Sequence, residues 1–455
     1  MTLGWNTSVY VLCGVAMLIM AVLVAAEPSL LLATVVVPAA LAVTLASWSA
    51  LKGNRAATLV LVFAAVFLID IVFRVRDYQD KGVDFQVILK LALWGLIGLV
   101  AIVHARRWLG GVLTPSHIPW IMFLIWLPFT ATVSSVPAYS AVAAFSILAY
   151  AIFCTYIFAT LDHVEIFAAM VAAIVIFCTI SIAMYFAVPE FGRYVYWLNE
   201  QRYVSGRLSG VAGSANNMGR IAAFGLLLLG LYAREFSAYS KLATLIAAIV
   251  MGAALVMTNS RTSMAMLAAI LSAVYVLRWR RLYIAVFAIS IVLVSTAMLI
   301  PAGDEAVKLI SRSGNIDEVT SMTGRTDIWY AVLKLAEEHP VTGHGYASSI
   351  FVLPQYERQV GFLTSHAHNL MLQLLLTTGW IGVILFSLAV ACVAIRAMIF
   401  GDRVVLALLS FVFLNGVTES SGFTTLANIC TLAFATAFAL PPLRYDNENY
   451  SPYQR

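Results

Sequence analysis

The stretch Ile166–Val188, IFAAMVAAIVIFCTISIAMYFAV, decides the fold class of this chain. It contains no charged residue, and it is longer than the roughly 20 residues that an α-helix needs to cross the hydrocarbon core of a bilayer. Strands of a membrane barrel alternate apolar with polar residues, and this stretch does not alternate. It therefore predicts a transmembrane helix.

Similar runs recur along most of the chain. Of its 455 residues 62% are hydrophobic and 11% are charged, which is less than half the charged fraction of about 25% in soluble domains. We therefore expect an all-α polytopic membrane bundle of about 12–14 transmembrane helices. It forms one domain over residues 1–441, and a polar cytoplasmic tail, 442–455, follows it. The apolar runs are 9–26, 29–51, 57–73, 87–105, 118–134, 141–160, 166–188, 221–233, 242–257, 263–277, 282–300, 370–395, 404–414 and 424–440.

The five cysteines all lie inside these runs, which indicates small core residues and no disulfide or metal framework. The net charge is only +5, so the positions of the basic residues tell more than their sum. They flank every second loop, and the positive-inside rule places those loops in the cytoplasm. Two polar loops, 190–215 and 301–365, then face the outer side. Within the second loop, residues 326–339 have helical spacing of apolar residues, which predicts a short amphipathic helix.

Arginines in the outer loops run against this charge bias, so we expect them to hold an anion. Arg207 lies in the glycine-containing segment 202–220, before a predicted helix whose N-terminus suits a phosphate. Arg261 lies in a short hairpin between two apolar runs, where a charge needs a partner. Arg325 follows a turn glycine. The alternatives are contact with lipid headgroups, a snorkelling anchor and, for Arg325, pairing with Asp327.

The segment TSHAHN, residues 364–369, places two imidazoles at the start of an apolar run. If Ser365 is the N-cap of a helix, His366 and His368 occupy its first turn and their rings point about 200° apart. Only one of them can then face a given site. A neutral imidazole can take a proton from a sugar hydroxyl, which makes this segment a candidate general base. A simple polar helix cap is the alternative. Asp77 and Asp80 could hold a metal or act as a base, but a solvated loop with internal ion pairs is the favoured interpretation. No other carboxylate pair has clear metal-ligand spacing, so no metal is expected.

The histidine segment also carries a resemblance. His368-Asn369, nine residues and then Gly379-Trp380-Ile381-Gly382 resemble the H-N-x9-G-x-x-G signature of the bacterial O-antigen ligase and polymerase superfamily. Segments 205–219, 258–264, 323–329 and 339–348 are similar to other segments of that family, in the same order. The segment GSANNMG, 213–219, departs from the family, whose members often carry Asn-Pro-Asn there, and this leaves the shape of that turn open.

The resemblance implies an inner-membrane glycosyltransferase of the O-antigen ligase type, which works on the periplasmic face without metal or cofactor. Its donor is a glycan linked to undecaprenyl diphosphate, and its acceptor is a hydroxyl of lipid A-core or of another glycan, with membrane lipids around it and no nucleic acid partner. The family's catalytic base maps to His368, and its motif arginines map to Arg207 and Arg261. Arg325, His366 and Asn369 are further candidates for substrate binding.

Two other functions stay open at this point. An O-antigen or exopolysaccharide polymerase of the same superfamily needs the same donor site. A polysaccharide or lipid transporter, or flippase, would explain many helices with intramembrane polar groups such as Asp70 and Lys90. Against a carrier, the ionisable groups gather in the outer loops, and matching broken helices in two halves are missing.

Overall fold

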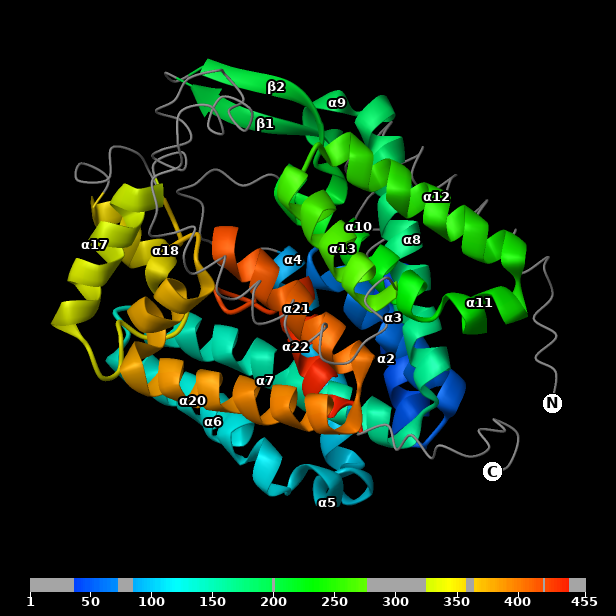
Figure 1. Cartoon of the computed structure of the whole chain (residues 1–455), viewed down its shortest axis with the longest axis horizontal. Coiled ribbons are helices and arrows are strands. Elements are labelled where there is room, and N and C mark those ends of the chain that lie inside the picture. Colours follow the sequence, from blue (N-terminus) through cyan, green and yellow to red (C-terminus); the bar gives the residue numbers. More distant parts are fainter. Residues whose placement is uncertain are drawn as a thin grey trace.

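The computed structural model describes residues 37–72, 85–198, 201–275, 325–356, 364–419 and 422–441, and it is almost entirely helical (Figure 1). The helices are α2 (Val37–Leu51), α3 (Arg55–Ile69), α4 (Phe85–Val103), α5 (Leu109–Val112), α6 (Ile118–Thr130), α7 (Pro137–Thr160), α8 (His163–Ala187), α9 (Pro189–Gly192), α10 (Ala215–Leu231), α11 (Ala233–Tyr239), α12 (Lys241–Thr258), α13 (Arg261–Tyr275), α17 (Arg325–Glu338), α18 (Ser349–Val352), α20 (Leu370–Phe400), α21 (Arg403–Thr418) and α22 (Ile429–Ala439). The strands are β1 (Arg193–Leu198) and β2 (Gln201–Leu208).

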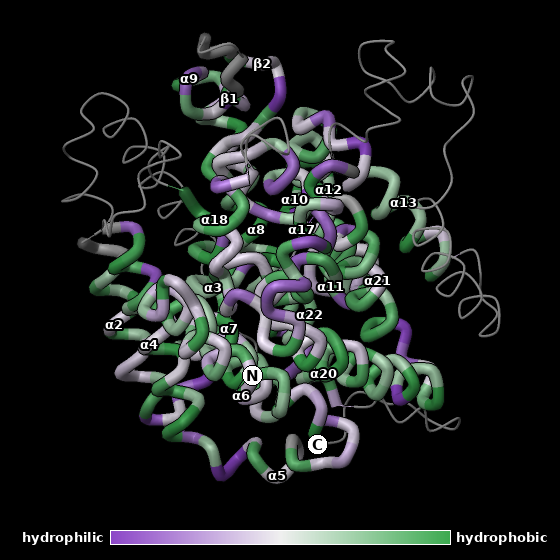
Figure 2. The backbone as a smooth tube through the Cα atoms, turned by 90° about the vertical axis from the view of Figure 1, so that its left-hand side faces the viewer, coloured by the Kyte–Doolittle hydropathy of each residue, from purple (hydrophilic) through white to green (hydrophobic). Residues whose placement is uncertain are grey.

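The predicted fold class, an all-α polytopic membrane bundle, is confirmed. Six helices in the described ranges are long and apolar enough to cross a bilayer, and α10 with α11 forms a further candidate span bent by 80°. Five shorter apolar helices accompany them. Most of the helices are hydrophobic along most of their length (Figure 2). The predicted runs 9–26 and 282–300 lie outside the described residues, so the total number of helices stays a prediction.

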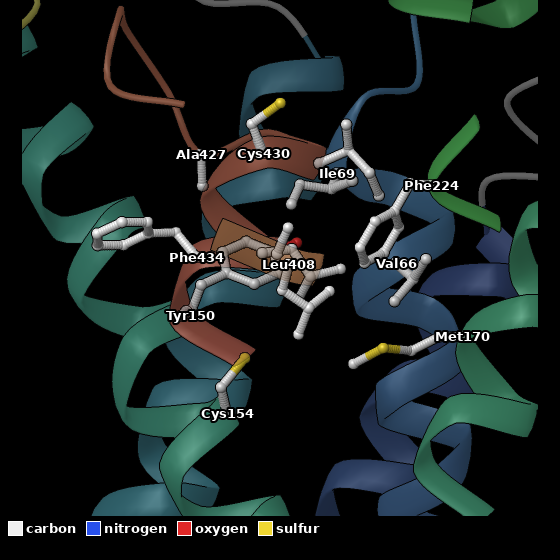
Figure 3. Close-up of a cluster of buried hydrophobic side chains, with 14 of the residues drawn as sticks. Val66, Ile69, Tyr150, Cys154, Met170, Phe224, Leu408, Ala427, Cys430 and Phe434 are labelled. Atoms are coloured by element: carbon white, nitrogen blue, oxygen red, sulfur yellow. The ribbon is translucent and has the colours of Figure 1, made fainter. Parts of the chain in front are cut away.

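The centre of the bundle is an apolar core in which helices from both halves of the chain meet. Val66 of α3, Phe224 of α10 and Leu408 of α21 converge there with side chains of α7, α8 and α22 (Figure 3). The hydroxyl of Tyr150 donates to the Ala65 carbonyl at 2.7 Å, so even the polar tip of this buried ring has a partner. Cys154, Cys178 and Cys430 are buried and Cys392 is half-buried, as expected for core residues; Cys13 lies outside the described residues.

The loop 190–215 contains a structure that the sequence did not predict. Strands β1 and β2 form an antiparallel hairpin with Val195 opposite Val204. Valine, tyrosine and tryptophan fill this segment, and these residues favour extended backbone, which accounts for the hairpin in place of an irregular loop. Arg207 lies in β2, one residue before its end, so the hairpin sets the position of Arg207. The short turn before α10 follows directly.

The long helix α20 is broken inside its span at Gly379, whose φ of 65° and ψ of −171° only glycine adopts readily. A break frees backbone groups that lipid cannot satisfy. The neighbouring turn 339–345 satisfies them: the Trp380 N–H donates to the Pro340 carbonyl at 2.8 Å, and the His344 N–H donates to the Leu376 carbonyl at 2.9 Å. Segments 339–348 and 379–382, which both resemble the O-antigen ligase family, are therefore held together by backbone hydrogen bonds at the break in α20.

Replacing Gly379 with alanine is expected to lower the thermal stability of the protein by an amount equivalent to about 1–3 kcal/mol or more. The new Cβ would lie 2.2 Å from the Val341 carbonyl oxygen, in a backbone conformation that L-residues avoid. Unfolding of the purified chain in detergent, followed by tryptophan fluorescence, measures the change. The control is Gly252→Ala in α12, where no atom approaches the added Cβ within 4 Å, and which is expected to keep or raise stability. Equal midpoints for the two variants would contradict the role of the break.

Candidate functional site

The segment that carries the two histidines precedes α20 and is not its first turn. The N-cap of α20 is Asn369, whose side-chain oxygen accepts the N–H groups of Met371 at 2.9 Å and Leu372 at 3.0 Å. The prediction of Ser365 as the N-cap is therefore wrong, because an asparagine four residues later satisfies the free N–H groups of the helix instead. Asn369, a predicted substrate-binding residue, thus has a capping role and a buried side chain.

The predicted divergence of the two imidazoles is also wrong. His368 has a left-handed backbone with φ of 50°, so the helical geometry behind that prediction does not apply. The ring centroids of His366 and His368 lie 4.1 Å apart, and both rings face the same carboxylate, that of Glu419. The Nδ1 atom of His368 lies 3.2 Å from Glu419 Oε2, whereas His366 Nε2 lies 3.9 Å from the same oxygen. His368 has the hydrogen-bonded position.

Glu419 lies one residue beyond the end of α21, with its side chain only 15% exposed. Burial by itself raises the pKa of this carboxyl, but the hydrogen bond with His368 and the charges of Arg220 and the two histidines lower the pKa to about 2. The carboxylate is therefore ionised at neutral pH. A buried ionised carboxylate is stable only when hydrogen-bond donors surround it, and Glu419 has them on both oxygens.

The second oxygen of Glu419 connects the histidines to Arg207. Asn216, in the first turn of α10, donates from Nδ2 to Glu419 Oε1 at 3.0 Å. The Oδ1 of the same amide accepts from the Arg207 guanidinium at 2.9 Å. A continuous chain of hydrogen bonds thus runs from Arg207 through Asn216 and Glu419 to His368. It joins residues of four separate segments, 161 positions apart at its ends, into one site.

Arg207 is also anchored to the hairpin between α12 and α13. Its Nε donates to the carbonyl of Thr258 at 2.9 Å, and its guanidinium lies 5.5 Å from the centre of the Tyr194 ring. Three residues after Thr258, Arg261 opens α13 with an exposed side chain. The structure therefore places the segments of both predicted motif arginines beside each other, with Arg207 itself bonded to the segment that carries Arg261.

Comparison with known proteins adds one finding. Residues 246–387 match the family model described as O-antigen ligase. The match covers less than a third of the chain, and it supports membership of the O-antigen ligase superfamily. No curated protein matches the chain. The matched segment contains Arg261, Arg325 and the His366–Asn369 loop, while Arg207 and Glu419 lie outside it, one on either side.

Arg325 is the first residue of α17, and its side chain lies outside the described residues. The helix itself is tied to the histidine loop of the O-antigen ligase domain, because the Trp329 indole donates to the Ala367 carbonyl at 3.0 Å. In Figure 1, α17 and α18 lie together at one side of the bundle, away from both labelled termini. The predicted helix at 326–339 is thus present, and it supports the loop that carries His368.

The intramembrane polar groups that favoured a transporter have structural partners. Asp70 accepts the Ile429 N–H at 2.8 Å and the Asn217 amide at 3.3 Å. Lys90 donates to the Ile69 carbonyl at 3.2 Å. These bonds tie the end of α3 to α4, α10 and α22, next to the Asn216 position of the site. They give Asp70 and Lys90 a role in holding the helices of the bundle together.

Sequence reasoning missed Glu419, Asn216 and Arg220. Glu419 follows the predicted span 404–414, and the alternation of spans puts its end on the same side as the start of 370–395, where His368 lies. This predicted topology could have identified Glu419 as an acidic residue on the same side of the membrane as the histidines. Arg220 donates to Asn217 at 3.2 Å, and its buried Nε has no hydrogen bond to any described residue. No sequence signal separated Arg220 from the other outer arginines.

Proposed function

We propose that the chain is an inner-membrane glycosyltransferase of the ligase type. It moves a glycan from undecaprenyl diphosphate to a sugar hydroxyl of an acceptor such as lipid A-core. The observation that carries the proposal is the chain of hydrogen bonds from Arg207 to His368, because it joins a guanidinium and an imidazole in one network, which supports these two roles. Membership of the O-antigen ligase superfamily supports the same chemistry.

In this proposal His368 is the general base. Its Nδ1 faces the ionised Glu419 at 3.2 Å, which favours the tautomer with the proton on Nδ1. The lone pair of Nε2 is then free to accept the proton of the acceptor hydroxyl. The carboxylate also stabilises the imidazolium that forms when that proton arrives, as in other His-carboxylate pairs. Glu419 acts through His368, and it is a positioning residue.

Arg207 and Arg261 hold the lipid diphosphate in the proposal. Guanidinium groups bind phosphate oxygens by forked hydrogen bonds, and their charge stabilises the diphosphate as it leaves. The acceptor oxygen attacks the anomeric carbon from the face opposite the diphosphate, the bond to the diphosphate breaks, and the configuration inverts. Arginine supplies the positive charge, so the step itself uses no metal. Arg325 belongs to the same proposed set of phosphate-binding residues.

The proposed site faces the periplasm. The support is the distribution of basic residues: Lys52, Arg106, Arg234 and Arg396 all lie near the ends of predicted spans opposite to the end that carries the histidine segment. A periplasmic site suits a donor whose glycan is presented on the outer side of the inner membrane.

Replacing His368 with alanine is expected to lower donor turnover by about 10²–10⁴-fold, because the general base is lost. Binding of the lipid diphosphate is expected to persist, since the arginines remain. His366→Ala is the matched control on the neighbouring ring and should give a smaller loss, as His366 lies farther from Glu419. Both variants are assayed for turnover and for donor binding at equal amounts of folded protein. Full activity of His368→Ala, or equal losses for the two, would show that the base lies elsewhere.

Lysine in place of Arg207 or Arg261 is expected to reduce turnover by about 10–100-fold, which corresponds to the loss of one charged hydrogen bond. An ammonium keeps the charge, but it cannot reproduce a forked guanidinium contact. At position 207 it also cannot reach Thr258 and Asn216 together as the guanidinium does. The control is Arg55→Lys, on an exposed pair with Glu165, which should leave turnover unchanged. Near-normal turnover of both site variants would contradict the diphosphate role.

Deleting the gene separates ligase from polymerase. A ligase transfers finished glycan, so a deletion strain is expected to accumulate full-length polymer that is not attached to lipid A-core. Gel analysis of the glycans, with the wild-type gene restored as the control, measures this. Accumulation of single repeat units would contradict the ligase proposal and identify a polymerase of the same superfamily.

A further inference from the structure

Three side chains of the site bring possible metal-ligand atoms close together. His366, His368 and Glu419 each offer a ligand atom, and these atoms lie within 4.8 Å of one another. The left-handed backbone of His368 brings the two rings to the same side of the loop. The cluster therefore arises from the backbone before α20 and from the end of α21, two elements that pack against each other.

Two of these three metal-ligand groups, those of His366 and Glu419, are oriented by a second hydrogen bond on the side away from the cluster. Ser365 Oγ lies 2.9 Å from His366 Nδ1, which leaves Nε2 directed at Glu419. Asn216 donates to Glu419 Oε1, which leaves Oε2 directed at both rings. Second partners of this kind orient the ligands of metal sites. Here Ser365 orients His366 in this way, and Asn216 orients Glu419.

We propose that His366, His368 and Glu419 form a binding site for a divalent transition metal of the Zn²⁺ type, and that metal bound there inhibits the enzyme. Two imidazoles and one carboxylate are a ligand set that Zn²⁺ favours and that Mg²⁺ and Ca²⁺, which require oxygen ligands, do not. In tetrahedral zinc sites the ligand atoms lie about 3.4 Å apart, from bonds of about 2.1 Å. The separations of 3.2 and 3.9 Å to Glu419 Oε2 bracket this value.

Inhibition follows from the two nitrogens of His368. In the active form the proton sits on Nδ1, facing Glu419, and Nε2 keeps its lone pair. A metal ion that binds Nδ1 takes the place of that proton, and the neutral ring then carries its proton on Nε2. The imidazole gains a metal bond and loses no net proton, but Nε2 becomes a donor and cannot act as a base. This consequence rests on the proposed role of His368, whereas metal binding itself does not.

The surrounding charge keeps the site reversible. Arg207 binds Asn216 on the other side of Glu419, and Arg220 acts electrostatically on the same carboxylate. Both guanidinium groups oppose a dication, so the affinity is that of an exchangeable site and not of a structural one. The site therefore responds to the concentration of free metal outside the membrane.

Binding is tested with Co²⁺ as a spectroscopic probe on the purified full chain in detergent. The wild type is expected to develop visible absorption bands that saturate at one equivalent and that Zn²⁺ removes by displacement. His366→Ala should weaken binding by at least about 10–100-fold. The matched control is His339→Ala, which removes a histidine whose ring lies 4.7 Å from that of His344 outside the cluster, and it should bind as the wild type does. Absence of bands, or equal binding by His366→Ala, overturns the metal site and leaves the proposed function standing.

Inhibition is tested by donor turnover with added Zn²⁺, each variant being compared with its own rate in EDTA. The wild type should lose activity reversibly, and half-inhibition of His366→Ala should need a Zn²⁺ concentration higher by the factor found with Co²⁺. If the wild type and His366→Ala are half-inhibited at the same Zn²⁺ concentration, the proposal is overturned. Saturation of the site by metal with unchanged turnover overturns the inhibitory role, and with it His368 Nε2 as the base.

Discussion

A buried carboxylate that must be satisfied on both oxygens organises the site. An ionised glutamate at 15% exposure would be strongly unfavourable without donors, and Glu419 obtains them from separate elements. Asn216 brings the first turn of α10, and His368 brings the loop before α20. Because the carboxylate stabilises the bundle only when these ends meet, its burial fixes His368 relative to Arg207, which binds the same asparagine.

The break in α20 at Gly379 supplies the second constraint. The half-helix that follows Asn369 must end before Gly379, and the turn 339–345 must dock there to satisfy the freed backbone groups. The same turn leads from α17, whose Trp329 holds the histidine loop through the Ala367 carbonyl. Gly379 of the sequence signature thus has a structural role, because the turn that docks at the break connects to the helix that holds the histidine loop.

The sequence predicted the membrane bundle because apolar runs of sufficient length have one stable solution in a bilayer. It also selected His368 and Arg207, and the structure joins these two residues through a network. It did not predict the β-hairpin, whose aromatic strands lie inside a polar loop. It misplaced the helix cap at Ser365, because several capping residues precede the apolar run and only tertiary contacts choose Asn369 among them. Glu419 was missed because no local pattern distinguishes an acid at a helix end from one that faces a histidine across the site.

The proposed site depends most directly on the hydrogen bond between Glu419 and His368. Its sharpest test is donor turnover by Glu419→Gln, by His368→Ala and by the double variant, at equal amounts of folded protein. A glutamine can donate to Nδ1 and stabilise the wrong tautomer, so Glu419→Gln alone is expected to lose about 10²–10⁴-fold, and to lose little more once His368 is absent. Near-normal turnover of Glu419→Gln, or losses that multiply in the double variant, would contradict the account, because the carboxylate would then not act through the histidine.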